Sequence, residues 1–300
     1  MTSTVDATPA QWPSEPRPEK PAADADAVRR ARRVLAVYAD GTPRETRGQR
    51  LYDAWQLARS LGADAEHELM HARFDAGQEQ RRSELLGRLL VPVPAGELLM
   101  GGDPPTGYAY YGEAPAHRVR LRTFTIASVP VTNGMYRAYD PTRSLGEPDD
   151  LPVVDVTWYD AVMFCRWLGL RLPTEAEWEY ACRGFDGDPE PGELASYAWH
   201  AENAGGRLHE VGRLAPNALG VRDLQGNVWE WCQDRYDPEF YARSPALDPV
   251  NDDVGTDRVC RGGSFHGFAD MCRSTLRYHE PPDYWAPDIG FRCAGDIDPQ

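Results

Sequence analysis

The stretch VRDLQGNVWEWCQD, residues Val221 to Asp234, alternates apolar, polar and aromatic side chains around a central Gly226-Asn227. Glycine tolerates a positive φ, so the backbone can turn sharply here and aim its carbonyl groups at one point. A lone glutamate, Glu230, follows between two tryptophans in a run with the alternation of a β-strand. The stretch therefore predicts a tight turn that leads into a strand of an aromatic core.

The oxygen atoms of this turn form a candidate calcium site. Asp223 and Glu230 supply carboxylates, and the backbone carbonyls of Gly226 and Val228 supply neutral oxygens. Calcium prefers hard oxygen ligands of this kind. The alternative is a turn without metal, in which backbone amides hold Glu230. Spacing alone leaves both interpretations open.

Composition restricts the class of protein. The chain has 300 residues, a formal net charge of −15 and an isoelectric point of about 4.9, which argues against a nucleic-acid or anionic-membrane partner. No apolar run approaches the roughly 20 residues that cross a bilayer. The N-terminus, MTSTVDATPAQW, lacks the basic and apolar regions of a secretory signal. These features predict a cytoplasmic protein without a membrane anchor.

The chain divides into three parts by composition. Residues 1–25 are rich in proline, alanine and acidic residues, and are predicted to be disordered. Residues 26–90 predict a helical appendage of two or three helices, over 28–38, 51–61 and 63–90, which is a candidate contact for a protein partner. Residues 91–300 predict a domain of short strands and helices. Its expected strands cover 97–100, 117–121 and 123–126, and its expected helices cover 132–139, 158–168 and 174–182. The last helix opens with a capping box, Thr174 to Glu177.

A series of short motifs runs through the third part. In order they are MGG (100–102), APAHRV (114–119), VTN (131–133), VTWYDA (156–161), RLPTEAEWEYA (171–181), PNALG (216–220), GNVWEW (226–231), RGGS (261–264) and GFRC (290–293). This series resembles the sulfatase-modifying-factor, or formylglycine-generating enzyme, superfamily. The resemblance implies an α+β, C-type-lectin-like fold, low in regular structure, with structural calcium at Asp223, Gly226, Val228 and Glu230. A second family calcium site would begin at Asn203, where the following loop is shorter here.

The resemblance also identifies a departure from the family's chemistry. Formylglycine-generating enzymes oxidise a substrate cysteine at a copper(I) ion held by two cysteine thiolates, and paired soft thiolates suit that ion. Here the second cysteine falls on Cys272, the first on Gly267, and the tyrosine before the second on Met271. One thiolate cannot form the linear pair. We therefore expect a divergent member of the family, in which Cys272 is structural or has another partner.

A second group of residues offers candidate ligands for copper or iron. His266, Cys272, His279 and Glu280 lie in one segment and mix soft and borderline ligands; the alternative is a polar pocket without metal. Ergothioneine-type sulfoxide synthases, a second branch, hold iron with an HxxxHxE motif on N-terminal helices.

Two N-terminal histidines partly match that iron motif. His67 and His71 fit its first part, but Arg73 stands at the acidic position, so an exposed helical pair is the favoured interpretation.

The six cysteines include no CxxC pair, which argues against a zinc site. The resemblance implies that Cys165 and Cys293 are neighbours that some relatives link by a disulfide. It also places Arg277 where the usual partner of Cys182 would stand. Cys232 and Cys260 are predicted to be small core residues.

Two functions remain in view. The first is a repurposed, oxygen-dependent oxidoreductase acting on a peptide or small molecule, with Trp229, Ser264 and Cys272 at its site. The second is a binding module for a peptide or small-molecule ligand, which uses the surface of Phe265 to Asp288. Rigid aromatic side chains on a supported loop suit recognition. The residues expected to contact the ligand are His266, Tyr278, His279, Tyr284 and Trp285.

Overall fold

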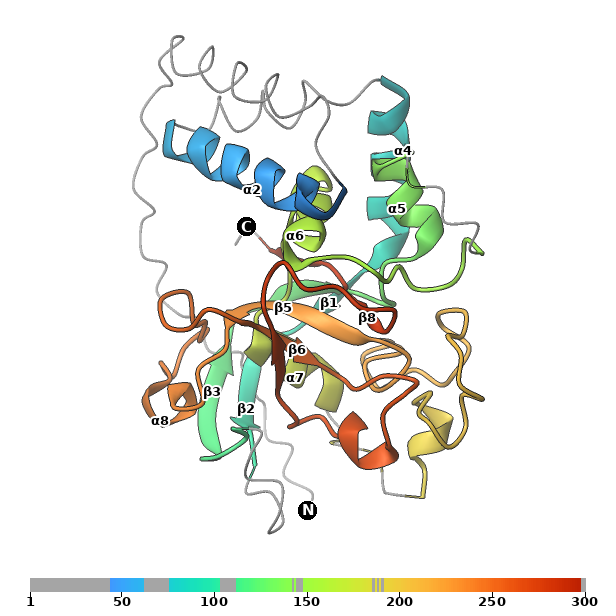
Figure 1. The fold of residues 1–300 in the computed structure, drawn as a ribbon. Helices are drawn as coiled ribbons and strands as arrows, with labels where there is room; N and C mark the ends of the chain where they lie inside the picture. Colours follow the sequence, from blue (N-terminus) through green and yellow to red (C-terminus); the bar gives the residue numbers. More distant parts are fainter. Residues whose placement is uncertain are drawn as a thin grey trace, which may run out of the picture.

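The computed structural model describes residues 44–61, 76–102, 112–141, 143, 148–184, 187, 189 and 192–297. Within these ranges the strands form three small sheets (Figure 1). The sheets are β1 (Leu90–Val93), β4 (Phe124–Ala127) and β9 (Ala294–Asp296); β2 (Gly96–Met100) and β3 (His117–Leu121); and β7 (Tyr278–Glu280), β6 (Arg258–Arg261), β5 (Trp229–Arg235) and β8 (Ile289–Gly290). β5 and β8 pair in parallel, and the other neighbours are antiparallel.

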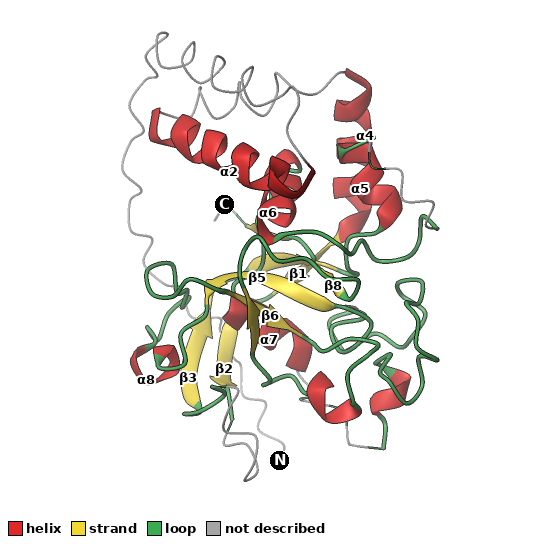
Figure 2. Ribbon diagram, viewed as in Figure 1, coloured by secondary structure: helices red, strands yellow, loops and turns green. Residues whose placement is uncertain are grey.

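The helices range from 4 to 18 residues and gather mostly on one side of the strands. They are α2 (Arg44–Leu61), α4 (Ala76–Leu89), α5 (Asn133–Tyr139), α6 (Trp158–Trp167), α7 (Glu175–Arg183) and α8 (Phe240–Arg243), with 3₁₀ turns at Leu194–Ser196 and Ala269–Cys272. Figure 2 shows α2, α4, α5 and α6 grouped together, whereas the chain after α7 is mostly loop. The predicted scarcity of regular structure in this region is confirmed.

Local capping chemistry sets the starts of the domain's helices. The predicted capping box is present: the backbone N of Glu177 donates to Thr174 Oγ1 at 3.1 Å, and the backbone N of Thr174 donates to Glu177 Oε2 at 2.8 Å. A second box, unforeseen, joins Thr157 and Asp160 at the start of α6. Such reciprocal bonds satisfy amide groups that a helix start would otherwise leave unpaired. The predicted helices and strands of this part lie within one or two residues of the observed ones.

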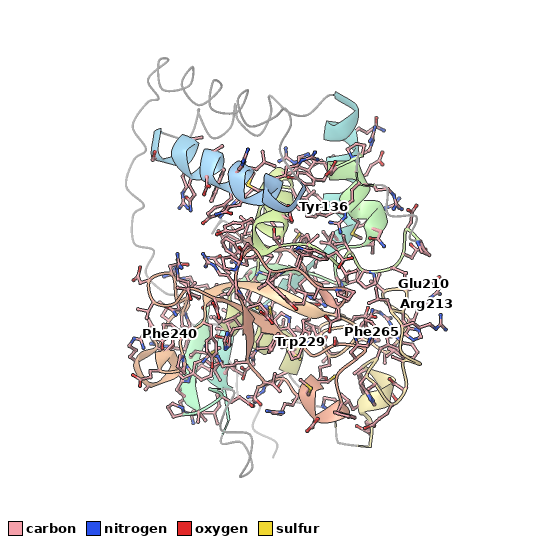
Figure 3. The ribbon with its side chains drawn as sticks, viewed as in Figure 1. Tyr136, Glu210, Arg213, Trp229, Phe240 and Phe265 are labelled. Carbon is pink, nitrogen blue, oxygen red and sulfur yellow. The ribbon has the colours of Figure 1, made fainter. Side chains whose placement is uncertain are left out.

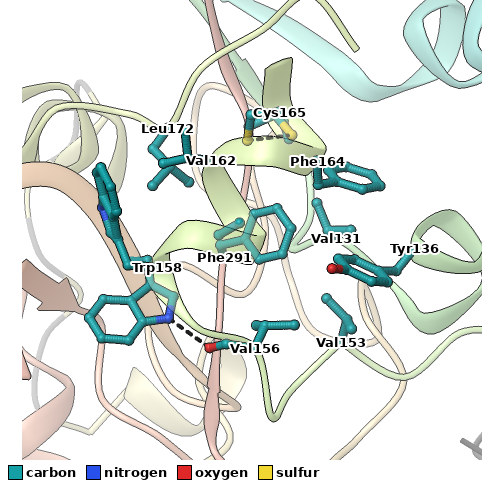
Figure 4. Packing of buried hydrophobic residues seen from close by; sticks show 14 of the residues in the cluster. Val131, Tyr136, Val153, Val156, Trp158, Val162, Phe164, Cys165, Leu172 and Phe291 are labelled. Atoms are coloured by element: carbon teal, nitrogen blue, oxygen red, sulfur yellow. Dashed lines mark hydrogen bonds between the residues drawn. The ribbon is translucent and has the colours of Figure 1, made fainter. Parts of the chain in front are cut away.

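An aromatic core forms around α6 (Figure 4). The Phe164 ring stacks on Tyr136 with centroids 5.5 Å apart and meets Phe291 edge-on at 5.5 Å. Trp231 donates from Nε1 to the carbonyl of Val156 at 3.1 Å, so its polar edge is satisfied inside the core. Strand β5, which the opening stretch predicts, thus packs its second tryptophan directly under α6.

The cysteine thiols lie inside the protein. All six are buried and unbridged. The Cys165 and Cys293 sulfurs are 3.4 Å apart, so these residues are neighbours as the resemblance implies, but they are thiols, since a disulfide bond is about 2.05 Å long. Cys232 and Cys260 are fully buried core residues, as predicted.

Helix α2 packs against α6, which it crosses near one of its ends (Figure 1). Tyr52 contacts the rings of Trp158 and Tyr159 with centroids 5.3 and 5.2 Å apart. A Cβ at Gly48 would stand 2.2 Å from Asp160 Oδ1, so only glycine permits this approach. The predicted helix over 51–61 is confirmed within α2. The described part of the next predicted helix is α4, which leads directly into β1.

Several predictions lie outside the described residues: the tail 1–25, the helix over 28–38, and His67, His71 and Arg73. The boundary between the appendage and the domain also stays a prediction. Among the described helices, none combines the length and the apolar character needed to cross a bilayer.

Candidate functional site

The Gly226 turn has the left-handed backbone that the sequence predicts. Asp223, Gly226 and Asn227 have φ values of 55°, 74° and 61°. A Cβ at Gly226 would lie 2.2 Å from the carbonyl oxygen of Trp199 and 2.8 Å from its nitrogen. The positive φ favours glycine at position 226, and the close backbone contact with Trp199 requires it.

Asn227 joins the turn to two other loops. Its side-chain amide donates to the carbonyl of His209 at 3.0 Å, and the backbone N of His209 donates back to Asn227 Oδ1 at 3.1 Å. The backbone N of Phe265 donates to the carbonyl of Asn227 at 3.0 Å. The His209 ring in turn stacks on Trp199 at 3.7 Å. The turn therefore positions the start of residues 265–288.

Glu230 forms an ion pair inside the protein. Arg292 donates to both carboxylate oxygens at 2.7 Å, and Trp178 Nε1 donates to Oε2 at 2.8 Å. All of this is buried, with Glu230 and Arg292 at 0% exposure. Burial raises the pKa of Glu230, and Arg292 and Trp178 oppose the rise. Neither of the two sequence interpretations foresaw Arg292 as the partner of Glu230.

Asp223 supplies the second buried carboxylate near the Gly226 turn. Its Oδ2 accepts from the backbone N of Gly212 at 2.5 Å, whereas its buried Oδ1 has no hydrogen-bond partner. Burial raises the pKa of Asp223, and the charge of Asp223 raises the pKa of Glu230. Arg292 thus contacts Glu230 directly, whereas Asp223 is hydrogen-bonded through one oxygen and leaves the other acceptor unused. This donor set fits an additional cation with a preference for oxygen.

The position of the family's copper thiolates holds one cysteine. The Cys272 side chain is fully buried, and a Cβ at Gly263 would lie 2.8 Å from its sulfur. Burial, reinforced by the charges of Asp270 and Glu202, raises the pKa of the Cys272 thiol to about 12. A Cβ at Gly267 would meet Met271 at 3.4 Å, which is ordinary contact. Cys272 is therefore a protonated core thiol at neutral pH.

Trp229 and Ser264, the other predicted catalytic residues, are joined through Asp288. Ser264 Oγ donates to Asp288 Oδ2 at 2.8 Å, and the backbone N of Trp229 donates to the carbonyl of Asp288 at 2.8 Å. The Trp229 ring stacks on Tyr278 with centroids 4.9 Å apart. Ser264 is 1% and Trp229 4% exposed. Figure 3 places Trp229 near the middle of the molecule and Phe265 to one side of it.

The four residues considered as an alternative metal site have separate partners. His279 Nδ1 lies 2.8 Å from Asp257 Oδ2, and its ring stacks on Tyr236 at 3.9 Å. Glu280 accepts a hydrogen bond from the Tyr278 hydroxyl, and the exposed His266 ring packs on Phe265. In the described part of the chain, no three or more His, Cys, Asp or Glu side chains are grouped to hold a metal.

Residues 265–288 carry the exposed aromatic side chains. Within the described ranges Phe268, Tyr284 and Trp285 are exposed by 66%, 42% and 50%, and every other described Phe, Tyr and Trp is at least partly buried. Tyr284 and Trp285 were predicted as ligand contacts. Phe268 was not among the predicted ligand contacts. It lies four residues after the RGGS motif, and its immediate neighbours, Gly267, Ala269 and Asp270, are small or polar.

Buried arginines hold residues 273–277 in place from inside. Arg277 donates to Glu175 from Nε at 2.7 Å and from Nη2 at 3.0 Å, and Arg261 donates from Nη1 to the same carboxylate at 3.2 Å. Arg277, which stands at the position that the resemblance assigns to the partner of Cys182, forms an ion pair with Glu175 instead. Arg261 opens the RGGS motif and Arg277 stands outside the quoted motifs, and the sequence gives no indication of the distant partner of either arginine.

Comparison with known proteins agrees with this architecture. A family model described as the sulfatase-modifying factor enzyme 1-like domain matches residues 76–297. The chain belongs to this family. Among the solved structures similar to this family member, Treponema denticola variable protein 1 has a TM-score of 0.60 and 28% identity, covering 69% of this chain and 95% of that one. The structure of PvdO from Pseudomonas aeruginosa has a TM-score of 0.62 and 26% identity, covering 69% and 94%. The predicted C-type-lectin-like α+β fold is confirmed.

Relatives of this sulfatase-modifying-factor family member differ in what their names state. The formylglycine-generating enzyme of Streptomyces coelicolor is 34% identical, over 69% of this chain and 89% of that protein. The inactive C-alpha-formylglycine-generating enzyme 2 of Mus musculus is 29% identical, over 68% and 85%. Since one name denotes an enzyme and the other an inactive relative, family membership by itself does not decide whether this chain is catalytic.

Proposed function

We propose that this chain is a recognition module on the formylglycine-generating-enzyme fold, and that residues 265–288 form its ligand-binding surface. The observation that carries the proposal is the difference in exposure between the thiol and the aromatic side chains of this segment. Its single thiol, Cys272, is fully buried and lacks the second cysteine, whereas Phe268, Tyr284 and Trp285 extend into solvent.

Exposed aromatic rings favour a binding role on energetic grounds. A large apolar side chain that stays in water does not gain the free energy of burial, which is roughly 25 cal/mol for each Å² of apolar surface. Rigid aromatic residues recover it on contact with a partner, and they lose little conformational entropy because they have few rotatable bonds. The supporting backbone is held by Asn227 and by the ion pair of Arg277 with Glu175.

The proposal is tested by selecting peptides from a random displayed library on the immobilised wild-type chain. Selected peptides are then measured against the triple variant Phe268→Ala/Tyr284→Ala/Trp285→Ala. We expect binding to weaken about tenfold or more, as for loss of interface anchors. The substituted side chains are exposed, so circular dichroism should show an unchanged fold. Equal binding to the triple variant, or no enrichment on wild type, would overturn the proposal.

An oxygen-dependent oxidoreductase is the second candidate. It is favoured by the 34% identity to a formylglycine-generating enzyme and by the presence of Cys272, Trp229 and Ser264 in the chain. Copper or iron would be its metal, yet the described residues offer one thiolate position and no grouped ligands. These residues do not fit a linear two-thiolate copper ion, and no catalytic step is assigned to them.

The variant Gly267→Cys should bind copper(I) where wild type does not. Position 267 has room for a Cβ, and a second thiolate five residues before Cys272 would complete the soft pair that copper(I) favours. Competition with a chromophoric copper(I) chelator measures this directly. The control Gly267→Ser adds a side chain without a thiol and should behave as wild type. Tight, stoichiometric copper on wild type that disappears in Cys272→Ala would instead support the oxidoreductase.

We propose structural calcium at Asp223, Gly226, Val228 and Glu230, where it would supply a partner for the unpaired Oδ1 of Asp223. Removing calcium with a chelator should lower the melting temperature of wild type, and calcium should restore it. At a concentration 100 times the dissociation constant, the stabilisation would be about 2.7 kcal/mol. The variant Asp223→Asn should lose this response. A melting temperature of wild type that does not change between chelator and calcium would exclude the proposed site.

A further inference from the structure

We propose that the ligand of this surface is a basic peptide segment, which presents arginine or lysine side chains to residues 280–288. This inference rests on the proposed recognition function and adds the chemical class of the partner. Residues 280–288, EPPDYWAPD, are called the acidic aromatic loop below.

The acidic aromatic loop is fixed at several points along its backbone. The backbone N of Tyr284 donates to the carbonyl of Pro281 at 2.9 Å, which closes a turn. The carbonyls of Pro282 and Ala286 accept from the backbone N of Trp158 at 3.1 Å and of Asp155 at 3.0 Å. The loop is therefore held against the start of α6 before any ligand arrives, which reduces the entropy lost on binding.

Two aromatic rings and three carboxylates share this loop. Tyr284 and Trp285 are exposed by 42% and 50%. Asp283 immediately precedes them and is exposed, while Glu280 and Asp288, at the two ends, are half-buried. An arginine or lysine can stack on the face of an exposed aromatic ring while its charge meets a carboxylate.

The hydrogen-bond partners that the structure describes for these carboxylates are uncharged. Glu280 accepts from the Tyr278 hydroxyl, and Asp288 accepts from Ser264 Oγ at 2.8 Å, so their visible partners are neutral. Among the described residues, none of Glu280, Asp283 and Asp288 forms an ion pair. Buried carboxylates elsewhere differ, since Glu113, Glu175 and Glu230 each contact an arginine.

The nearby arginines point to other partners. Arg273 and Arg277, the arginines within residues 265–288, pair with Glu113 and Glu175. Arg258 lies opposite Glu280 in the β6–β7 register, yet its guanidinium lies 3.7 Å from the centroid of the Trp158 ring and donates to a backbone carbonyl. The loop thus presents negative charge beside apolar rings, on a chain of net charge −15. This field attracts cations and repels phosphate-bearing partners.

The test uses a fluorescent peptide with three arginines separated by glycine-serine pairs. Its control is the same peptide with citrulline, which keeps the shape of arginine without the charge. In fluorescence anisotropy, we expect the arginine peptide to bind at least about tenfold more tightly than the citrulline peptide, and to weaken as salt rises. Equal binding of the two peptides to wild type would overturn the inference without the use of any variant.

Variants locate the binding site on the loop. Glu280→Gln/Asp283→Asn and Trp285→Ala should each weaken the arginine peptide about tenfold. The matched controls Glu239→Gln and Leu247→Ala alter an exposed carboxylate and an exposed apolar side chain outside the loop, and should leave binding unchanged. Equal loss in the loop and control variants would show a non-specific charge effect and contradict the inference.

The two proposals fail in different ways. If library-selected peptides are neutral or acidic and still lose binding in the triple aromatic variant, the recognition function stands and the basic class is wrong. If the triple variant binds every selected peptide as wild type does, the recognition surface itself is wrong.

Discussion

Replacing Arg292 with methionine should lower the free energy of unfolding by about 3–5 kcal/mol, because it leaves a buried carboxylate without its charged partner. Arg292 and Glu230 are 0% exposed, and two hydrogen bonds of 2.7 Å join them. Methionine keeps an unbranched apolar stem in the space, but it also removes the hydrogen bonds that Arg292 donates to the carbonyls of Ala127 and Arg222 at 2.9 Å. Urea unfolding, followed by tryptophan fluorescence in the presence of chelator, measures the change without a contribution from calcium.

Two comparisons make this measurement specific to the buried pair. The exposed pair of Arg213 and Glu210 is the matched control, and Arg213→Met should cost no more than about 1 kcal/mol. The double variant Arg292→Met/Glu230→Leu removes both charges and should recover much of the loss, since apolar replacement of a buried pair is often close to neutral. A loss below about 1 kcal/mol for Arg292→Met would show that Glu230 is compensated by another group.

Replacing Gly226 with alanine should cost about 4 kcal/mol or more, or prevent folding entirely. The new Cβ would lie 2.2 Å from the Trp199 carbonyl oxygen, and backbone atoms on both sides would have to separate. The loop after Trp199, which His209 and Asn227 join to this turn, would move with it. Thermal unfolding and the yield of folded protein check the expectation.

Gly206 provides the matched control for this substitution. Its φ of 70° is close to the 74° of Gly226, but no atom lies within 4 Å of its added Cβ. Gly206→Ala therefore measures the cost of the left-handed backbone alone, roughly 1–2 kcal/mol. If the two alanine variants were equally stable, the close approach of Trp199 would not be what requires glycine at position 226.

The sequence is sufficient for much of the fold because its strongest patterns are local. Thr174 and Glu177 are three residues apart, and their capping box fixes the start of α7 whatever surrounds it. The GNVWEW turn likewise combines a glycine, an asparagine and a strand pattern within six residues. The series of family motifs then predicted the fold class, because the motifs occur in the same order as in the family.

Pairings between distant residues could not be predicted in the same way. Arg292 meets Glu230 across 62 positions, and Arg277 meets Glu175 across 102. Nothing in the spacing of either arginine indicates which carboxylate it contacts. The exposure of single side chains could not be predicted either. Phe268 and Phe265 are three residues apart and chemically alike, yet Phe268 is 66% exposed and Phe265 is 5% exposed. The candidate surface therefore depended on tertiary structure.

Because α2 packs against α6, the folded unit begins earlier in the chain than the region that matches the family. The family match begins at residue 76, but Trp55 and Ala58 of α2, which precede it, are 3% and 0% exposed. The Arg166 guanidinium on α6 also lies 4.7 Å from the centroid of the Trp55 ring. A fragment that begins at residue 76 would lack α2 and would expose the rings of Trp158 and Tyr159, which creates an apolar surface prone to aggregation. Recombinant versions of this chain should therefore start ahead of Arg44, so that α2 is kept.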